Sequence, residues 1–358
     1  MVVTDAKPGY MKYRLRLLAL LLLFAIIGGC ASPAYYLHAV SGQVELLNKR
    51  RLVEAVLSDP ATTPQTRQQL ERVRRLRDFA SRELGLPDNR SYRTYADLER
   101  PFVVWNVFAT PELSLEPKQW CFVFAGCVSY RGYFAQDKAE KFAVNLKQDG
   151  YDIYVGGVPA YSTLGWFSDP LLNTFIHRSE ADLAGLLFHE LAHQVVYAGG
   201  DSAFNESFAT MVELEGVQRW FEHHGTPQQA QAYRQKIRRR EQFTALVLKH
   251  KARLAEIYAS NLGAAEKRPA KARIFGELRN DYVTLKAGWN GHADFDRWFE
   301  QDLNNAHLAA IGMYHRHVAA FQNMLAQQGG DLAAFYRAVK ELADLPKTER
   351  DAMLNREP

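Results

Sequence analysis

The chain has 358 residues, of which 47% are hydrophobic, 12% aromatic and 23% charged. This composition excludes an intrinsically disordered chain, and the length allows one large domain or two smaller ones. The net charge of +4 is mostly N-terminal, because residues 1–29 contain four Lys and Arg residues against one Asp. The rest is nearly neutral and has no long-range field that would attract nucleic acid, so no nucleic-acid partner is expected.

The first expected element is a targeting segment. Lys12, Arg14 and Arg16 introduce the apolar run LRLLALLLLFAII, which is shorter than the roughly 20 residues of a membrane-spanning helix and is typical of a signal peptide. The run ends in IIGGC and resembles a bacterial lipobox. The resemblance implies that residues 1–29 are a lipoprotein signal peptide, that Cys30 is lipidated, and that the chain is anchored in the bacterial cell envelope facing the periplasm. An uncleaved short anchor is the alternative, and it would also tether the chain to a membrane.

Residues 30–86 are expected to form an N-terminal helical hairpin. Helical periodicity runs through 35–58 and again through 64–84, and the intervening SDPATTP supplies a proline-rich turn. The second stretch has an amphipathic stripe formed by Leu70, Val73, Leu76, Phe79 and Ala80. Its arginines are expected to lie on a solvated face.

Residues 87–225 are expected to form an α/β core. FVVWNVFA (102–109) and CFVFAGCVSY (121–130) are rich in β-branched and aromatic residues and predict strands. A helix over about 136–148 leads into YDIYVGG, a further expected strand. AYSTLGWFSDP (160–170) contains Gly and Pro and is expected to run from extended chain into a loop.

Two cysteines lie within the predicted strands of this core. Cys121 and Cys127 bracket CFVFAGC, and in an oxidising periplasm a disulfide is the default for such a pair. The same pair in a cytosolic protein could suggest a metal site, although a lone pair at this spacing is a weak metal signal.

Two helices with clear end signals follow. Ser179 can cap the first, whose apolar face runs to Val195 before a stop at the glycine pair 199–200. Asp201 or Ser202 can begin the second helix, which continues toward the next glycine-containing turn.

Residues 226–358 are expected to be a mostly helical C-terminal part of the same unit. The segment AYRQKIRRREQFTALVLKHKARLAEIY predicts one long amphipathic helix, and KRPAK and KAGWNGHAD mark breaks. The elements together predict an α+β fold with a small mixed sheet and a mostly helical C-terminal half.

The first of the two punctuated helices carries FHELAH, a metal-binding pattern. His189 and His193 lie one turn apart, so both imidazoles project from one face and can bind the same zinc ion. Glu190 lies about 100° around the helix, where it can reach a metal-bound water whose pKa zinc lowers toward ~7. Glu190 would take the proton and pass it to the leaving amine. The same pattern also occurs by chance on helices whose histidines only make core or surface hydrogen bonds.

The second helix carries FNESFA, which resembles the NExxA element of gluzincin peptidases such as aminopeptidase N-like enzymes and thermolysin. The resemblance implies that Glu206 is the third zinc ligand and that Asn205 stabilises the local geometry. The stretch between His193 and Glu206 is shorter than in those enzymes, but a tight helix–GG–helix turn can still return the second helix to the first. Glu213 lies two turns further on and can hold a ligand imidazole or replace Glu206 as ligand. A solvated helix carboxylate is the alternative for Glu213.

A wider resemblance extends beyond the metal motif. The lipobox, GCVSYRGYF, AYSTLGWFSDP, FHELAHQVVY and FNESFAT, in this order, resemble the bacterial family of predicted aminopeptidase lipoproteins over nearly the whole mature chain. The resemblance implies a zincin-like, gluzincin-type metallopeptidase with one zinc ion and peptide substrates trimmed from the N-terminus. An envelope endopeptidase of the same chemistry is one alternative. The other is a non-catalytic envelope lipoprotein with a structural zinc, although such sites usually have four protein ligands and no fourth is evident beside Glu190.

Two further groups are candidates to line the site. Peptidases of this type hold the substrate backbone against an extended edge strand, for which AYSTLGW is the natural segment, with a core strand and polar turn as the alternative. Its substrate-binding candidates are Tyr161, Ser162, Thr163 and Leu164. Gluzincins also often bring an oxyanion donor from the C-terminal helical part, and Tyr314 is favoured here over His315, His317 and residues 304–307. Capture of a free α-amine is left open among Asp169, Glu180, Asn304 and Asn305.

Overall fold

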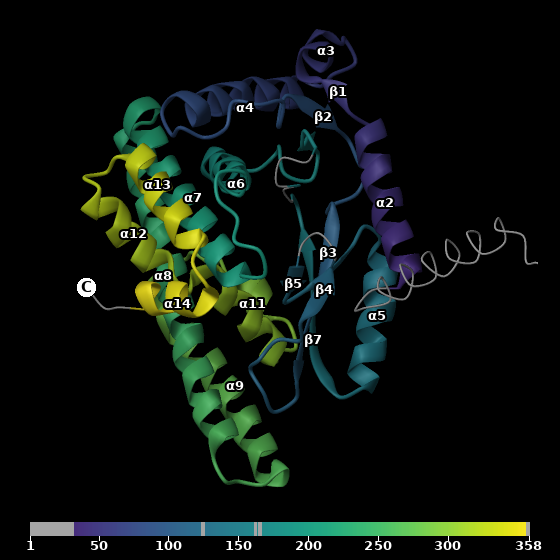
Figure 1. Cartoon of the computed structure of the whole chain (residues 1–358), viewed down its shortest axis with the longest axis vertical. Coiled ribbons are helices and arrows are strands. Elements are labelled where there is room, and N and C mark those ends of the chain that lie inside the picture. Colours follow the sequence, from purple (N-terminus) through teal and green to yellow (C-terminus); the bar gives the residue numbers. More distant parts are fainter. Residues whose placement is uncertain (1–31, 123–125, 161–162, 164–166, 356–358) are drawn as a thin grey trace, which may run out of the picture.

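The structure, a computed structural model, describes residues 32–122, 126–160, 163 and 167–355, and only the backbone of residues 312–315 (Figure 1). The predictions for the signal peptide and for Cys30 fall outside these residues, as do those for Tyr161, Ser162 and Leu164. Within the described part, every helix is too short or too polar to cross a membrane.

The N-terminal helices are separated by a strand and a short helix. The elements are α2 (Pro33–Asn48), β1 (Arg51–Leu52), α3 (Val53–Ser58) and α4 (Pro64–Arg82). Ser32 and Thr63 cap the two long helices, each followed by a proline in the first turn. The arrangement differs from the predicted hairpin, because β1 pairs with a later strand and diverts the chain between the two helices. Figure 1 shows α2 beside the strands and α4 across the top of the molecule.

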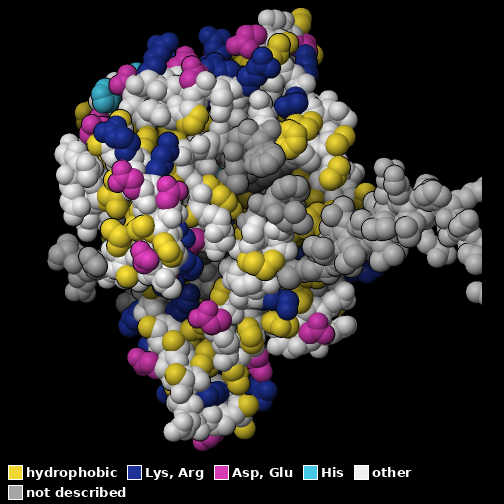
Figure 2. Space-filling view, viewed as in Figure 1, with side chains coloured by type: hydrophobic (Ala, Val, Ile, Leu, Met, Phe, Trp, Pro, Cys, Tyr) yellow, Lys and Arg dark blue, Asp and Glu magenta, His cyan; other side chains and the backbone are white. Residues whose placement is uncertain are grey.

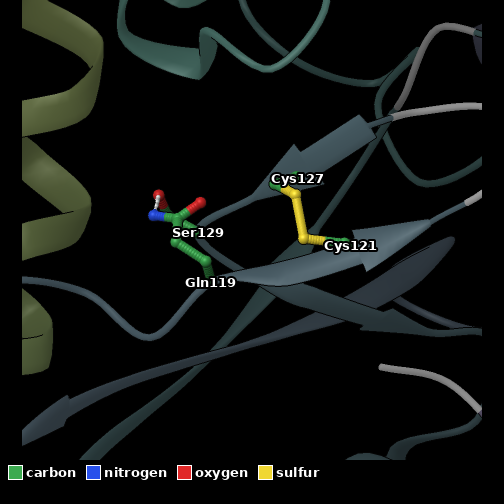
Figure 3. Close-up of a disulfide and its surroundings, with 4 residues drawn as sticks. All are labelled: Gln119, Cys121, Cys127 and Ser129. Carbon is green, nitrogen blue, oxygen red and sulfur yellow. Dashed lines mark hydrogen bonds between the residues drawn. A yellow bond between two sulfur atoms is a disulfide. The ribbon is translucent and has the colours of Figure 1, made fainter. Parts of the chain in front are cut away.

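The strands of the described residues form three small sheets. Their bounds are β2 (Thr94–Ala96), β3 (Val104–Pro111), β4 (Trp120–Phe122), β5 (Gly126–Val128), β6 (Arg131–Tyr133), β7 (Tyr151–Val158) and β8 (Leu171–Leu172). One sheet is mixed, in the order β1-β2-β8, and the antiparallel sheet has the order β6-β3-β7. β4 and β5 pair separately, with Cys121 opposite Cys127, and these two cysteines form a disulfide (Figure 3).

Alternation along β3 gives the antiparallel sheet two different faces. Trp105, Val107 and Ala109 pack with α5 (Gln136–Gln148) in one apolar cluster. The intervening Val104 and Asn106 point the other way and line a cleft. One face of this sheet is therefore covered by a helix, and the other forms part of the candidate site.

Helices make up the rest of the chain. They are α6 (Glu180–Ala192), α7 (Ser202–His224), α8 (Pro227–Ala259), α9 (Ala264–Ala287), α10 (Asp296–Phe299), α11 (Asn305–His315), α12 (Val318–Gln327), α13 (Leu332–Ala343) and α14 (Lys347–Leu354). The predicted α+β class and the predicted long helix are confirmed. α8 and α9 extend together from the body (Figure 1) and share an apolar cluster with α11, to which Val247, Leu278 and Leu308 belong.

The connection between α6 and α7 differs from the expected one. α6 ends at Ala192, so the prediction that its helical face reaches Val195 is wrong, and the chain turns before α7 begins. The Asn205 side chain accepts a hydrogen bond from the Ala198 N–H and donates one to the Ala198 carbonyl, both at 2.8 Å. These buried hydrogen bonds hold the turn in a non-helical conformation, a tertiary constraint that helical periodicity does not report.

Asp201, which caps α7, is expected to be a major source of stability. It is 3% exposed, accepts from the Phe204 N–H at 3.3 Å, and pairs with Arg350 of α14 at 2.9 Å. Removing one partner of a buried ion pair typically costs 3–5 kcal/mol, so Asp201→Asn should lower the free energy of unfolding by about 3 kcal/mol. Urea denaturation at neutral pH measures this loss.

The same ion pair makes part of the stability dependent on pH. Burial alone would raise the pKa of Asp201, but Arg350 and Lys347 hold that pKa below its usual value. The ion pair's contribution to the free energy of unfolding is therefore complete at neutral pH and is lost as the pH falls through the pKa of Asp201 in the folded state. The difference in the free energy of unfolding between wild type and Asp201→Asn should consequently shrink in acid. The exposed Asp149 provides the control, and equal unfolding midpoints for Asp201→Asn and Asp149→Asn would contradict the prediction.

Candidate metal centre

Three side chains from α6 and its C-terminal end and from α7 converge on one point. The candidate ligand atoms of His189, His193 and Glu206 all lie within 4.8 Å of one another. Glu206 Oε2 is 3.3 Å from His189 Nε2 and 3.8 Å from His193 Nε2. Two imidazole nitrogens and a carboxylate oxygen are a donor set that divalent transition metals accept. These three residues therefore form a group that can hold a metal ion.

Charge in this group is divided unequally between the two histidines. Burial lowers the pKa of His193 to about 4, so its ring is neutral at pH 7. Burial would also lower the pKa of His189, but hydrogen bonds with Glu206 and Glu213 outweigh it and raise that pKa to about 10. A proton and a metal ion compete for the same ring nitrogen, so metal binding here must displace a proton.

Glu190 lies in the same cleft as the ligand group but is not a member of it. Its carboxyl is buried, and burial raises its pKa to about 8, with further upward contributions from Glu206 and Asp169. A nearby cation favours the charged form of a carboxylate, so metal binding would return Glu190 toward the ionised state. A carboxyl whose pKa lies near neutrality is suited to accepting and returning a proton.

Behind His189 lies a supporting chain of polar contacts. Glu213 Oε2 is 3.3 Å from His189 Nδ1, and Arg240 Nη1 of α8 donates to Glu213 Oε1 at 2.8 Å. Burial would raise the pKa of Glu213, but Arg240 and His189 lower it to about 2, so this carboxylate stays charged. Gly185 permits the close packing of α6 on α7, since a Cβ there would lie 3.1 Å from Glu213 Cγ. Glu213 thus fixes the orientation of the imidazole whose other nitrogen faces Glu206.

Arg240→Gln is expected to weaken metal binding by about tenfold, because losing a partner behind a metal-binding histidine costs 10–100-fold in affinity. Without the guanidinium, Glu213 is held less firmly against His189. Competition with a chromophoric chelator measures the affinity. The adjacent Arg239 pairs with Asp294 instead, at 2.7 Å, so Arg239→Gln should bind metal as wild type does. Equal affinities for the two variants would refute the role of Arg240.

The ligand group opens into a cleft of about 710 Å³. One wall is formed by α6 and α7, and the opposite wall by β3, the β4–β5 hairpin and α2, through side chains such as Tyr36, Asn106 and Phe122. A larger cavity of about 890 Å³ lies against α3, α4 and β2 and shares no lining residue with the metal group. Donor atoms, and not cavity size, therefore distinguish the candidate site.

Tyr130 also lines this cleft, and the sequence analysis did not single it out. Burial raises its pKa, with further upward contributions from the charges of Glu206 and Glu190, which line the same cleft. The residue lies in the quoted segment GCVSYRGYF, but nothing in its local pattern distinguishes it from a core tyrosine. Arg240 was missed for a similar reason, since it is one of several arginines on α8.

Other predicted site residues lie in loops or on α11 and its N-terminal cap. The Thr163 hydroxyl and N–H both donate to the Asp169 carboxylate, at 2.8 and 3.0 Å, and Thr163 lies outside any described strand. Tyr314 is on α11, and its side chain is outside the described part of the chain. Asn304 and Asn305 donate to backbone carbonyls at the sheet, at 2.9 Å each to Ile153 and Glu112. These amides therefore have structural partners.

Of the candidates for capturing a free amine, Asp169 is buried, accepts hydrogen bonds from Thr163 and is not among the residues that line the cleft. Its charge acts on Glu190, and burial raises its pKa to about 6. Glu180 instead accepts from the Trp220 indole N–H at 3.0 Å on the opposite side of α6 from the ligand group. Only the fold distinguishes the environment of Asp169 from that of Glu180.

A family model matches most of the chain. Residues 34–354 match the model of a family described as "Putative aminopeptidase". No curated protein and no solved structure matches the chain.

Proposed function

The chain belongs to the family described as "Putative aminopeptidase", and from this membership we propose that it is a zinc-dependent aminopeptidase that removes residues from the N-terminus of short peptides. The observation that carries the proposal is the convergence of His189, His193 and Glu206 beside the buried Glu190, in a cleft large enough for a peptide. Ligand pockets of a few hundred Å³ and above commonly accept small peptides and similar molecules.

The donor set supports zinc as the metal. Two imidazoles and one carboxylate are the ligand type of catalytic zinc sites, which leave one coordination position open. His189, His193 and Glu206 would hold the ion, with Glu213 and Asn205 supporting them. When bound, zinc would act as a Lewis acid toward water and the scissile carbonyl. We infer a gluzincin-type, zincin-like enzyme from this arrangement.

The residues around the ligand group supply the proton transfers. Glu190, which metal binding would return toward the ionised state, would accept a proton from the attacking water and deliver it to the leaving amine. Tyr130, which lines the same cleft as Glu190 and Glu206, is a candidate donor to the developing oxyanion. Tyr314 remains the candidate that the family resemblance implies.

The cellular placement is also part of the proposal. The lipobox-like IIGGC supports lipidation of Cys30 after removal of residues 1–29, with the enzyme facing the periplasm. The Cys121–Cys127 disulfide is consistent with an oxidising compartment. The substrates would then be peptides of the cell envelope.

A panel of aminoacyl-naphthylamides tests the activity. The protein is first treated with a chelator and then supplied with zinc, and turnover should disappear and return. N-acetylation of the substrates should abolish turnover, because an aminopeptidase requires a free amine. Cleavage of blocked peptides would instead indicate an endopeptidase.

A purely structural zinc site is the remaining alternative. Closed structural sites take four protein ligands, whereas the group among the described residues has three. Absence of hydrolysis across free and blocked peptide libraries, in a protein that retains its metal, would favour this alternative.

A further inference from the structure

The helix α2 has an exposed apolar face. Leu37, Val40 and Val44 recur at helical spacing and lie on one side, where they are 72%, 60% and 47% exposed. Figure 2 shows hydrophobic side chains along the upper right of the molecule, where α2 lies in Figure 1. Exposed apolar residues are normal when scattered singly, but a continuous row of them marks an interaction surface.

Charge is absent from this outer face. The exposed residues of α2 are Pro33, Ala34, Leu37, Val40, Ser41, Val44 and Asn48. Apart from the half-buried His38, Glu45 is the one acidic or basic residue in the helix, and it pairs with Arg100 at 3.0 Å. In a chain with 23% charged residues, a surface helix whose outer side has no charge differs from an ordinary solvated helix.

The position of α2 in the chain identifies what can cover this face. α2 begins at Pro33, three residues after Cys30, and three residues span at most about 10 Å. With a lipid on Cys30, or with residues 15–27 retained as an anchor, the start of α2 lies at the membrane surface. This step rests on the membrane tether that forms part of the proposed function, and not on the peptidase activity.

We propose that the outer face of α2 docks on the phospholipid bilayer and lies in its interfacial layer. Helices that bind in this way present an apolar face to the acyl-chain boundary and keep polar groups at the headgroups. Lys138 of α5, whose Nζ is 3.1 Å from His38 Nδ1, provides an exposed basic group next to α2 for anionic headgroups. A tether alone leaves the body free to rotate, whereas this contact fixes its orientation.

Docking would give the active-site cleft a defined position relative to the membrane. The inner side of α2 contributes Tyr35, Tyr36 and Ala39 to the cleft wall. α2 therefore separates the bilayer from the ligand group, with lipid on one side of the helix and substrate on the other. Peptides would enter from the aqueous side, parallel to the membrane surface.

Spin labels on the full-length, membrane-anchored protein test this contact. Cys121 and Cys127 form a disulfide and the third cysteine is Cys30, so a cysteine introduced at Val40 can be labelled against the background of the unsubstituted protein. Val283 on α9 is 63% exposed and serves as the matched control position. The protein is placed in vesicles of phosphatidylethanolamine and phosphatidylglycerol, and collisions with oxygen and with a water-soluble nickel complex are measured.

The label at Val40→Cys should gain oxygen collisions and lose nickel collisions several-fold relative to the label at Val283→Cys, because oxygen partitions into lipid. Equal accessibility at the two positions would overturn the proposal. Spin–spin broadening at Val40→Cys would show that a second copy covers the face and would overturn it as well. Immobilisation of this label in detergent micelles to the same degree as in vesicles would show that another part of the chain covers it.

A charged double variant provides the second measurement. Leu37→Glu with Val44→Glu should restore nickel access to a label at position 40, while Val283→Glu should not. Hydrolysis of small peptides in detergent should be unchanged in both, because neither Leu37 nor Val44 lines the cleft. The docking result is read without any activity measurement, so failure of the peptidase proposal and failure of docking are distinguishable.

Discussion

Glu190→Gln is expected to reduce kcat by about a thousandfold, within the range for loss of a general acid–base residue. The amide keeps the size of the carboxylate but cannot accept a proton at neutral pH. Glu190 is outside the ligand group, so zinc content should remain at one ion per chain. Steady-state kinetics on an aminoacyl-naphthylamide, with metal content measured on the same sample, tests both expectations.

The control for this variant is a glutamate on the surface of α7. Glu215 pairs with Arg219 at 2.7 Å and does not line the cleft, so Glu215→Gln should retain wild-type turnover. A Glu190→Gln protein that remains folded, retains zinc and hydrolyses substrate at the wild-type rate would exclude Glu190 as the proton acceptor. Loss of zinc from the same variant would instead make Glu190 a ligand.

Glu206→Ala is expected to weaken zinc binding by more than about 100-fold, beyond the 10–100-fold that loss of a supporting residue causes. The change removes one of three candidate ligands and leaves two imidazoles. Activity at limiting zinc should be lost with the metal. Metal content after dialysis against a zinc buffer, together with a calorimetric titration, measures the effect.

Comparison with Glu213→Ala decides which carboxylate is the ligand. Glu206 faces Nε2 of His189, whereas Glu213 faces Nδ1 of the same ring, at 3.3 Å in each case. If Glu206 is the ligand, Glu213→Ala should cost only about 10–100-fold in affinity, as expected for a residue that orients an imidazole. A larger loss for Glu213→Ala than for Glu206→Ala would reverse the assignment and make Glu213 the third ligand.

The α+β class and most helix and strand positions could be predicted from local signals. Ser179 caps α6 and Asp201 caps α7, as their side chains predict, because a cap depends on atoms within a single turn. The strand around Trp105 was predicted from its β-branched and aromatic composition. The spacing of His189 and His193 determines that both rings lie on one side of the chain, whatever the rest of the fold does.

Tertiary packing decided the rest of the candidate site. Arg240, 27 residues further along the chain, reaches Glu213 from α8, and Tyr130 lines the same cleft from the segment between β5 and β6. The turn between α6 and α7 is held by buried hydrogen bonds between Asn205 and Ala198. Periodicity and capping report only neighbours within a turn or two, whereas these contacts depend on which helices and strands pack together across the whole chain.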